Sequence, residues 1–317
     1  MTITKDLSAP LVVVVGATGN QGSSVIQALL ESNKPYRVRG FTRDTSKPVS
    51  KELASQGVEM VAIEPKIGNK EQVLNEFKGA NVVFALTLTD WKEPSKELTE
   101  GKMFVDAAKE AKVSLFVWSG IQNMTEVTGG KYTHVTHFDV KQEVTQYLRA
   151  SCLHFVSVEP GSFMENYTTH SAPKKHADGE SFVIYGVNPP DSVVPLINTK
   201  HDYGLFVRKA IEAPGKQDEI FAHGEVISLA AMAERLSETT GKKVTYMQIS
   251  HAAFMAALTS RGFSNEIARS YLEMHLSVGE FGYFGKKDLG PSLEGLARAP
   301  RTWKQFVEVT DWSKILN

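Results

Sequence analysis

Residues 11–22 constrain the fold of this chain more than any other segment. Residues 11–15 form a continuous run of leucine and valine without polar alternation, which is typical of a strand buried on both faces of a parallel sheet. A glycine-rich turn follows, and apolar side chains at helical spacing then predict a helix over residues 22–32. A strand, a glycine turn and a helix in this order indicate the start of a βαβ unit.

The glycine-rich turn has the spacing that a phosphate-binding loop requires. Gly16 permits a tight turn out of the strand, Gly19 lets backbone N–H groups approach a pyrophosphate, and Gly22 lets the helix pack close to the sheet. The alternative is a tight βα loop without a ligand, but the position inside a βαβ unit favours a dinucleotide site. The candidate phosphate-binding residues are Gly16, Thr18, Gly19, Asn20, Gln21 and Gly22.

Short apolar runs and amphipathic stretches alternate along the first half of the chain. Further strands are predicted over residues 37–42, 58–63, 82–86, 115–118 and 155–158, and further helices over 70–77, 95–111 and 136–150. This alternation predicts an α/β fold with a Rossmann-type, doubly wound parallel sheet, because right-handed crossovers leave few other ways to cover both faces. We assign residues 1–158 to this dinucleotide-binding domain. Residues 159–317 are expected to form a smaller, mainly helical C-terminal lobe, with some segments packing back on the first domain.

The pattern changes after residue 160. Residues 171–191 contain three prolines and two adjacent lysines around one short predicted strand, 182–185, and we expect this loop-rich insertion to overlie the ligand site. Beyond it, strands are predicted near residue 220 and over 244–248, and helices over 202–212, 229–239, 252–258, 265–276 and 303–309.

Charge and composition exclude several classes of protein. The 317 residues carry 35 Lys and Arg against 36 Asp and Glu, and this net charge of −1 provides no attraction to nucleic acid or to an anionic membrane. No apolar run reaches the roughly 20 residues of a membrane span, and the first residues lack the apolar core of a signal peptide. We therefore expect a cytoplasmic protein, with the nucleus as an alternative compartment. The single cysteine, Cys152, lies among apolar neighbours and is predicted to be buried.

The end of the second predicted strand determines which dinucleotide fits. An NAD site usually offers a carboxylate to the 2′-hydroxyl of the adenosine ribose, whereas an NADP site offers a guanidinium to the 2′-phosphate. Arg43 comes first after this strand, and Lys47 adds a second positive charge. The residues therefore favour NADP(H), while Asp44 leaves NAD as a cofactor of lower affinity. The alternative is that Arg43 and Asp44 form only a solvated surface pair.

Five motifs carry a resemblance to a known family. They are VVGATGNQG at residues 14–22, RGFTRD at 39–44, GKMFVDAAKEAKVSLFVWS at 101–119, HFDVK at 137–141 and PGSFMEN at 160–166. Together they resemble the NmrA-like branch of the atypical short-chain dehydrogenases/reductases. The resemblance implies an NADP-binding Rossmann domain, a smaller C-terminal lobe and a cleft between the two.

The resemblance leaves two functions open, because a fold alone does not determine activity. The branch contains regulators and redox sensors that bind dinucleotides, beside quinone, ether and dye reductases. Our first interpretation is an NADP(H)-binding redox sensor that regulates a protein partner, for example in transcriptional regulation. The alternative is an NADPH-dependent reductase of a small carbonyl, quinone or enone-type electrophile. A sugar-nucleotide epimerase is disfavoured, because it would require a catalytic tyrosine four residues before Lys141, where this chain has His137.

The residues at the expected catalytic position differ from those of the wider superfamily. The superfamily uses Tyr-x-x-x-Lys, in which the i, i+4 spacing puts a tyrosine acid and a ribose-binding lysine on one helix face. Here the same spacing holds His137 and Lys141. The resemblance implies that Lys141 binds the nicotinamide ribose and, in reductase members, acts as acid/base. His137 is a second candidate proton donor, although a histidine at a helix start is more often a capping or surface residue.

Residues after the other predicted strands complete the expected site. Ser119 occupies the position of a substrate-orienting serine or of a strand-end hydroxyl, and Thr87 is expected to contact the cofactor. Further candidates are Thr89, Trp91, Tyr132, His134 and Phe163. His201, His223, His251 and His275 are dispersed without metal-ligand spacing, so no metal site is expected.

Overall fold

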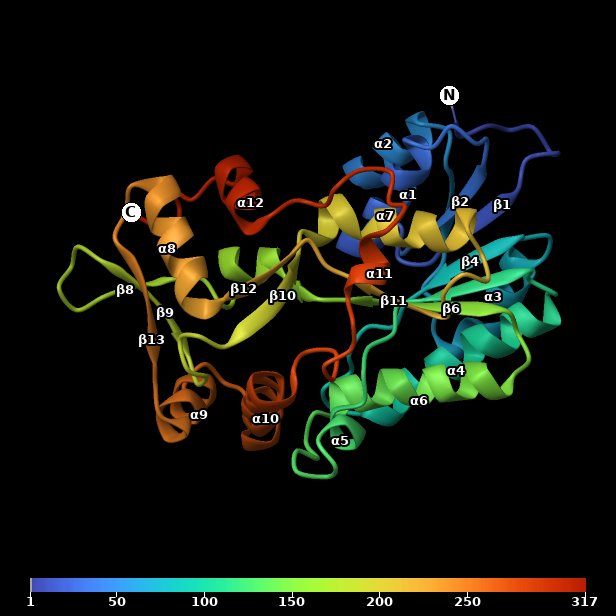
Figure 1. Cartoon of the computed structure of the whole chain (residues 1–317). Coiled ribbons are helices and arrows are strands. Elements are labelled where there is room, and N and C mark those ends of the chain that lie inside the picture. Colours follow the sequence, from blue (N-terminus) through green and yellow to red (C-terminus); the bar gives the residue numbers. More distant parts are fainter. Residues whose placement is uncertain (1) are drawn as a thin grey trace.

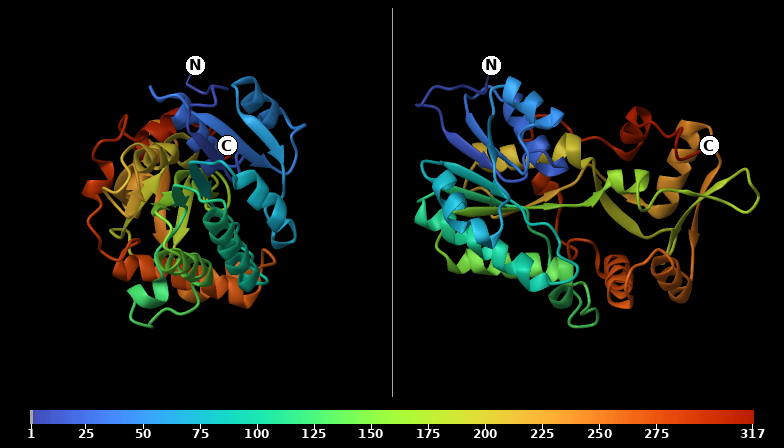
Figure 2. Two further views of the ribbon diagram at one scale, coloured as in Figure 1. Left: turned by 90° about the vertical axis from the view of Figure 1, so that its right-hand side faces the viewer. Right: turned by 180° about the vertical axis from the view of Figure 1, so that it is seen from behind.

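The computed structural model describes residues 2–317 as an elongated molecule with a large parallel sheet at one end and a second lobe at the other (Figures 1 and 2). The seven strands of this sheet run in the order β11-β6-β5-β4-β1-β2-β3, and every neighbouring pair is parallel. The strands are β1 (Leu11–Val14), β2 (Arg37–Thr42), β3 (Glu59–Ala62), β4 (Val82–Ala85), β5 (Leu115–Trp118), β6 (Phe155–Pro160) and β11 (Glu219–Ala222). The doubly wound, Rossmann-type fold is confirmed.

Helices cover both faces of the sheet. They are α1 (Asn20–Leu30), α2 (Pro48–Ser55), α3 (Lys70–Phe77), α4 (Pro94–Glu110), α6 (Thr136–Ala150) and α7 (Thr199–Glu212), with two short elements, η1 (Ile67–Asn69) and α5 (Met124–Val127). Side chains of α1 and α7 form one apolar core with the sheet, and side chains of α3, α4 and α6 form the other. The parallel strands are therefore buried from both sides, as their uninterrupted apolar sequences require.

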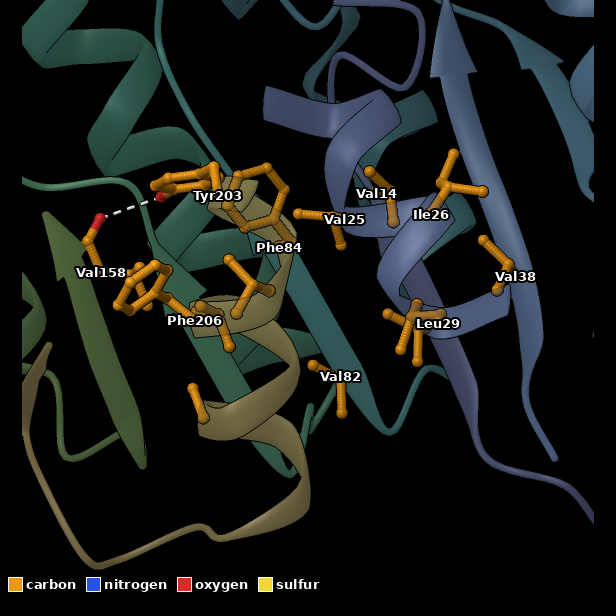
Figure 3. Close-up of a cluster of buried hydrophobic side chains, with 14 of the residues drawn as sticks. Val14, Val25, Ile26, Leu29, Val38, Val82, Phe84, Val158, Tyr203 and Phe206 are labelled. Atoms are coloured by element: carbon orange, nitrogen blue, oxygen red, sulfur yellow. Dashed lines mark hydrogen bonds between the residues drawn. The ribbon is translucent and has the colours of Figure 1, made fainter. Parts of the chain in front are cut away.

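The core on the α1 side locks two distant helices together (Figure 3). Val25 and Leu29 of α1 and Phe206 of α7 are fully buried beside the strands, and each such side chain contributes roughly 1.5–3 kcal/mol. Tyr203 of α7 donates its hydroxyl hydrogen to the Val158 carbonyl at 2.9 Å. A Cβ on Gly204 would lie only 1.9 Å from a backbone oxygen of α1, so glycine is required where the two helices cross.

The C-terminal lobe contains two small sheets beside its helices. One has the order β12-β10-β7 and the other β13-β9-β8. The elements are β7 (Ser162–Phe163), η2 (Met164–Thr168), β8 (Lys174–Lys175), β9 (Phe182–Gly186), β10 (Val193–Ile197), β12 (Glu225–Ser228), α8 (Leu229–Thr240), β13 (Val244–Gln248), α9 (His251–Thr259), α10 (Asn265–Phe281) and α12 (Trp303–Val309). Helix α11 (Gly290–Leu293) instead packs against β11 of the large sheet, where the Ser292 hydroxyl accepts a hydrogen bond from the Phe221 N–H. Trp303, Phe306 and Trp312 pack with α8 to form the core of this lobe.

Several elements differ from the sequence-based expectation. The loop-rich insertion predicted over residues 171–191 forms β8 besides the expected strand β9, and both strands belong to a sheet. Helix α2 was not predicted, because only Ser50 and Leu53 of it are buried. Strand β11 belongs to the large sheet and helix α7 packs against it, although both follow residue 159. The domain boundary at residues 158/159 stays a prediction. The burial predicted for Cys152 is wrong: this residue is exposed, with a left-handed φ of 61°, in the turn that joins α6 to β6.

No helix within residues 2–317 is both long and apolar enough to cross a membrane. The strand β6 ends at Pro160 and the chain enters β7 two residues later, so the carboxyl edge of the large sheet faces the C-terminal lobe (Figure 1). Ligands of doubly wound folds bind at this edge. The two lobes therefore meet where the sequence motifs place the functional residues.

Candidate functional site

The glycine turn after β1 is shaped by backbone contacts. Gly16 has a φ of +70°, which favours glycine, and a Cβ on Gly22 would lie 2.2 Å from the Gly16 oxygen. Gly19 is the N-cap of α1 and has no side-chain cap, and a Cβ there would meet only the Gly16 oxygen, at 3.3 Å. The first N–H groups of α1 are thus open to an anion, since Gly19 leaves their approach free.

The other residues of this turn fall into two groups. Thr18 and Asn20 are exposed at the start of α1, where a bound ligand can reach them. Gln21 instead turns inward and donates its side-chain N–H to the Ser119 hydroxyl at 2.7 Å. This hydrogen bond joins α1 to the loop after β5, and it brings Ser119 to the carboxyl edge where the sequence analysis placed it.

The predicted ribose contacts lie after β2. Arg43 and Lys47 are exposed, and neither forms an ion pair within residues 2–317. Asp44 accepts hydrogen bonds from the backbone N–H and hydroxyl of Ser46, at 2.8 and 2.6 Å, and these bonds hold the pKa of its carboxyl below the usual range. The Asp44 carboxylate, which would suit NAD, is therefore already hydrogen-bonded within its own turn, whereas Arg43 and Lys47 have no ion-pair partner within the described residues.

Lys141 lies at the centre of a buried network. Its Nζ donates to the carbonyl and the hydroxyl of Thr87, both at 3.0 Å, and to the carboxylate of Glu97. Thr87 in turn donates its hydroxyl to Glu97 Oε1 at 2.8 Å. An ammonium group has three donors, and here all three are occupied. Burial lowers the pKa of Lys141, and the charge of Glu97 opposes that shift.

Glu97 is the functional candidate that the sequence analysis missed. Its side chain is 1% exposed, and its Oε2 has no hydrogen-bond partner within residues 2–317. A buried carboxylate oxygen without a partner is costly and usually marks a site that binds something. The available signal was its spacing, because Glu97 lies one helical turn before Gly101 on the buried face of α4.

His137 lies one helical turn before Lys141, and its surroundings disfavour the protonated ring. Its ring lies 4.7 Å from the Trp91 ring, and its Nδ1 is 3.2 Å from the Ser270 hydroxyl. Burial lowers the pKa of His137 to about 3, and the charges of Lys141 and His275 contribute less. The neutral imidazole argues against the acid role expected for His137, so Lys141 is the stronger of the two catalytic candidates.

Three other predicted residues have structural contacts. The Tyr132 hydroxyl donates to Glu280 at 2.6 Å, and His134 Nδ1 lies 2.9 Å from Glu273 Oε1. Both acceptors belong to α10, so these residues attach the loop before α6 to the C-terminal lobe. Phe163 packs against the core on the α1 side.

From His137, one helical turn before Lys141, aromatic rings lead to a cavity. The Trp91 ring stacks on Tyr271 of α10 at 5.1 Å, and Tyr271 lines a cavity of about 520 Å³ in the C-terminal lobe. A cavity of this size accommodates a drug-sized ligand. The expected wall residue Trp91 therefore connects the two lobes. No group of metal-binding side chains occurs in the part of the chain described, residues 2–317.

Comparison with known proteins decides the family. The sequence model of the NmrA-like family matches residues 8–308. The chain belongs to the NmrA-like family. Among its relatives are NmrA-like family domain-containing oxidoreductases: malD of Malbranchea aurantiaca is 31% identical over 261 residues, covering 77% of each chain. Quinone oxidoreductase 2 of Escherichia coli is 24% identical over 295 residues, covering 92% of this chain and 95% of the relative.

Solved structures of NmrA-like proteins share the fold. NmrA, a negative transcriptional regulator, in complex with NADP has a TM-score of 0.78 at 20% identity and 97% coverage of both chains. An NADPH complex of the quinone oxidoreductase from Escherichia coli has a TM-score of 0.75 at 21% identity, covering 97% of this chain and all of the other. These two neighbours include a regulator and an enzyme, so the fold does not distinguish the two functions.

Proposed function

We propose that this protein is an NADPH-dependent reductase of a small-molecule carbonyl, quinone or enone. The observation that carries the proposal is the cavity, because the aromatic contacts from Tyr271 through Trp91 end at His137, one helical turn before Lys141 on α6. A sensor that only binds a dinucleotide needs no such cavity beside the reactive end of its ligand. The names of its relatives, oxidoreductases that include a quinone oxidoreductase, point the same way.

The residues present fit NADP(H). The uncapped N-terminus of α1 and the open side of Gly19 would accept the pyrophosphate. Arg43 would bind the 2′-phosphate with Lys47 beside it, because both cations are exposed and unpaired while Asp44 is engaged by Ser46. NAD is expected to bind at lower affinity. Thr87 and Lys141 would contact the nicotinamide ribose.

NADPH held at this edge would supply a hydride to the substrate. The protein would supply the proton, and Lys141 Nζ is its best source, because burial lowers the pKa of this ammonium and makes it a stronger acid. Glu97 and Thr87 hold the ammonium in place through hydrogen bonds. One of these bonds must give way when Lys141 turns to a ligand, since its three donors are occupied. Trp91 and Tyr271 would stack on a planar substrate and exclude water from the reacting atoms.

The regulator remains the second candidate. The observation that favours it is the Lys141 network, because a fully bonded ammonium and a neutral His137 leave no free proton donor. In that case the protein would bind NADP(H) without turnover and report the redox state to a protein partner.

A cofactor titration combined with a substrate screen separates the two. The reductase predicts steady NADPH oxidation with at least one class of planar quinone or enone, and a loss of this activity in Gly19→Val. Tight NADPH binding with no oxidation across carbonyls, quinones and enones would contradict the reductase and support the regulator. Equal affinity for NADPH and NADH would contradict the role of Arg43.

A further inference from the structure

The cavity of the C-terminal lobe joins segments that are far apart in the sequence. Its walls come from the sheet of β9 and β13, from the loop after η2, and from helices α9 and α10. Helix α9 has no buried residue, and its Phe254 ring meets the His275 ring edge-on at 5.5 Å. Apolar and aromatic side chains dominate the lining, so the interior suits a flat, apolar ligand.

The charged groups of the lining favour an electron-rich ligand. No aspartate or glutamate lines the cavity, whereas Lys174 and Arg261 do, and neither cation forms an ion pair within the described part of the chain. Burial lowers the pKa of His170, and the nearby charge of Arg261 adds to this shift. Two cations without an acidic partner create a positive potential at this rim.

Two tyrosines add hydrogen-bond donors deeper in the cavity. Tyr167 and Tyr283 line it, and neither hydroxyl donates a hydrogen bond within residues 2–317. Tyr246 differs, because its hydroxyl donates to the Asn188 carbonyl at 2.7 Å. Burial raises the pKa of both Tyr167 and Tyr283, so their hydroxyls stay protonated and available as donors. A ligand with acceptor oxygens would satisfy them.

We propose that this cavity binds a planar aromatic substrate that carries an anionic oxygen group, with its rings between α9 and the β9–β13 sheet and its anion against Arg261. Lys174 supports Arg261 at the rim, and Tyr167 and Tyr283 donate to the acceptor oxygens of the ring system. The end nearest Tyr271 then faces Trp91 and Lys141. That this ligand is the substrate rests on the proposed reductase function, whereas the binding preference does not.

A matched pair of fluorescent probes tests the preference without cofactor or turnover. Anilinonaphthalene sulfonate carries an anionic group on aromatic rings, and phenylnaphthylamine has the same rings without the charge. We expect the wild-type protein to bind the sulfonate at one site. Arg261→Gln should weaken the sulfonate about tenfold and change the affinity for the neutral probe less than about twofold.

Two further variants control the experiment. Lys242→Gln changes the net charge equally at an exposed position outside the cavity, and it should leave both affinities unchanged. Ala257→Trp fills the α9 wall and should weaken both probes together, with the melting temperature confirming that the protein remains folded. An unchanged sulfonate affinity in Arg261→Gln, or an equal loss in Lys242→Gln, would overturn the proposal. If the probe results hold while no electrophile oxidises NADPH, the reductase function fails and the cavity assignment stands.

Discussion

The two sides of the candidate site are built in different ways. On the sheet side, the contacts that matter are made by backbone: the Gly16–Gly22 approach and the N-terminus of α1 leave no side chain in the path of a phosphate. On the side of the C-terminal lobe, the cavity is defined by side chains such as Tyr271 and Arg261. Backbone recognition suits a cofactor that many proteins share, and side-chain recognition allows a substrate to change. We therefore expect substrate specificity to reside in the C-terminal lobe.

The largest effect should come from the backbone side. Gly22→Ala places a Cβ 2.2 Å from the Gly16 oxygen, a contact that the turn cannot relax, and we expect a loss of more than about 4 kcal/mol or no soluble protein. Gly19→Val is the contrast, since the extended backbone of Gly19 tolerates valine. It should keep the melting temperature and weaken NADPH at least about a hundredfold in calorimetry. A stable Gly22→Ala protein, or normal NADPH affinity in Gly19→Val, would mean that backbone contacts do not define this side.

Acid should lower the free energy of unfolding through two histidines, His137 and His275. Burial lowers the pKa of His137 to about 3 and that of His275 to about 4. The unfolded chain takes up these protons from about pH 6.5 downward while the folded protein does not, so stability is full above that pH and is lost as the pH falls. Between about pH 8 and pH 5, each histidine should account for about 2 kcal/mol of the loss.

Urea unfolding at the two pH values measures this effect. The double variant His137→Gln/His275→Gln should show a loss on acidification that is smaller by about 4 kcal/mol than that of the wild type. The same pH dependence in both proteins would show that these rings are accessible to protons in the folded state.

The buried ion pair predicts the next largest effect. Lys141→Met leaves the Glu97 carboxylate buried without its cation, and unfolding free energy should fall by about 3 kcal/mol. Lys141→Met/Glu97→Leu removes both charges and should recover most of that loss. Lys96→Met, at an exposed pair with Glu93, serves as the control and should cost less than about 1 kcal/mol. No rescue in the double variant would contradict a direct coupling of Lys141 and Glu97.

Cofactor preference is the smallest of the expected effects. Arg43→Ala should weaken NADPH by one to two decades, about 1.5–3 kcal/mol, because the charge-assisted contact to the 2′-phosphate is lost. NADH has no such phosphate, and its affinity should stay within about twofold. Lys51→Ala removes an exposed positive charge on α2 and provides the control for calorimetry. An equal loss for both cofactors would show that Arg43 supports the loop rather than the phosphate.

The sheet side could be predicted from the sequence because its signals are local. The β1 run, the glycine spacing and the helical periodicity of α6 each lie within about 20 residues, and the structure confirms these elements. The C-terminal sheets could not be predicted in the same way, since β9 pairs with β13 across a long intervening segment, with Phe182 opposite Val244. Helix α12, by contrast, was predicted with its observed bounds, residues 303–309, because its periodicity is local.

The site residues follow the same rule. Gly22 was expected from spacing alone to let the helix pack close to the sheet. The structure shows a need for glycine there, but the 2.2 Å approach is to the Gly16 oxygen of the turn. Glu97 was missed because a glutamate on an amphipathic helix is normally solvated, and only the position of Lys141 in three dimensions explains its burial. The low pKa of His137 likewise follows mainly from burial, and the ring packs among residues far from it in sequence, such as Trp91 and Ser270.

Deuterium transfer tests the central claim that the two sides act together. With NADPH deuterated at the transferring position of the nicotinamide, the wild-type protein should place deuterium on carbon in the product of a planar aromatic enone, where the new C–D bond does not exchange with water. Gly19→Val, which keeps the cavity, and Ala257→Trp, which keeps the glycine turn, should each abolish the transfer. Mass spectrometry of the product reads this out directly. Deuterated product from Ala257→Trp at the wild-type rate would contradict the account, because the cavity would then have no part in the reaction.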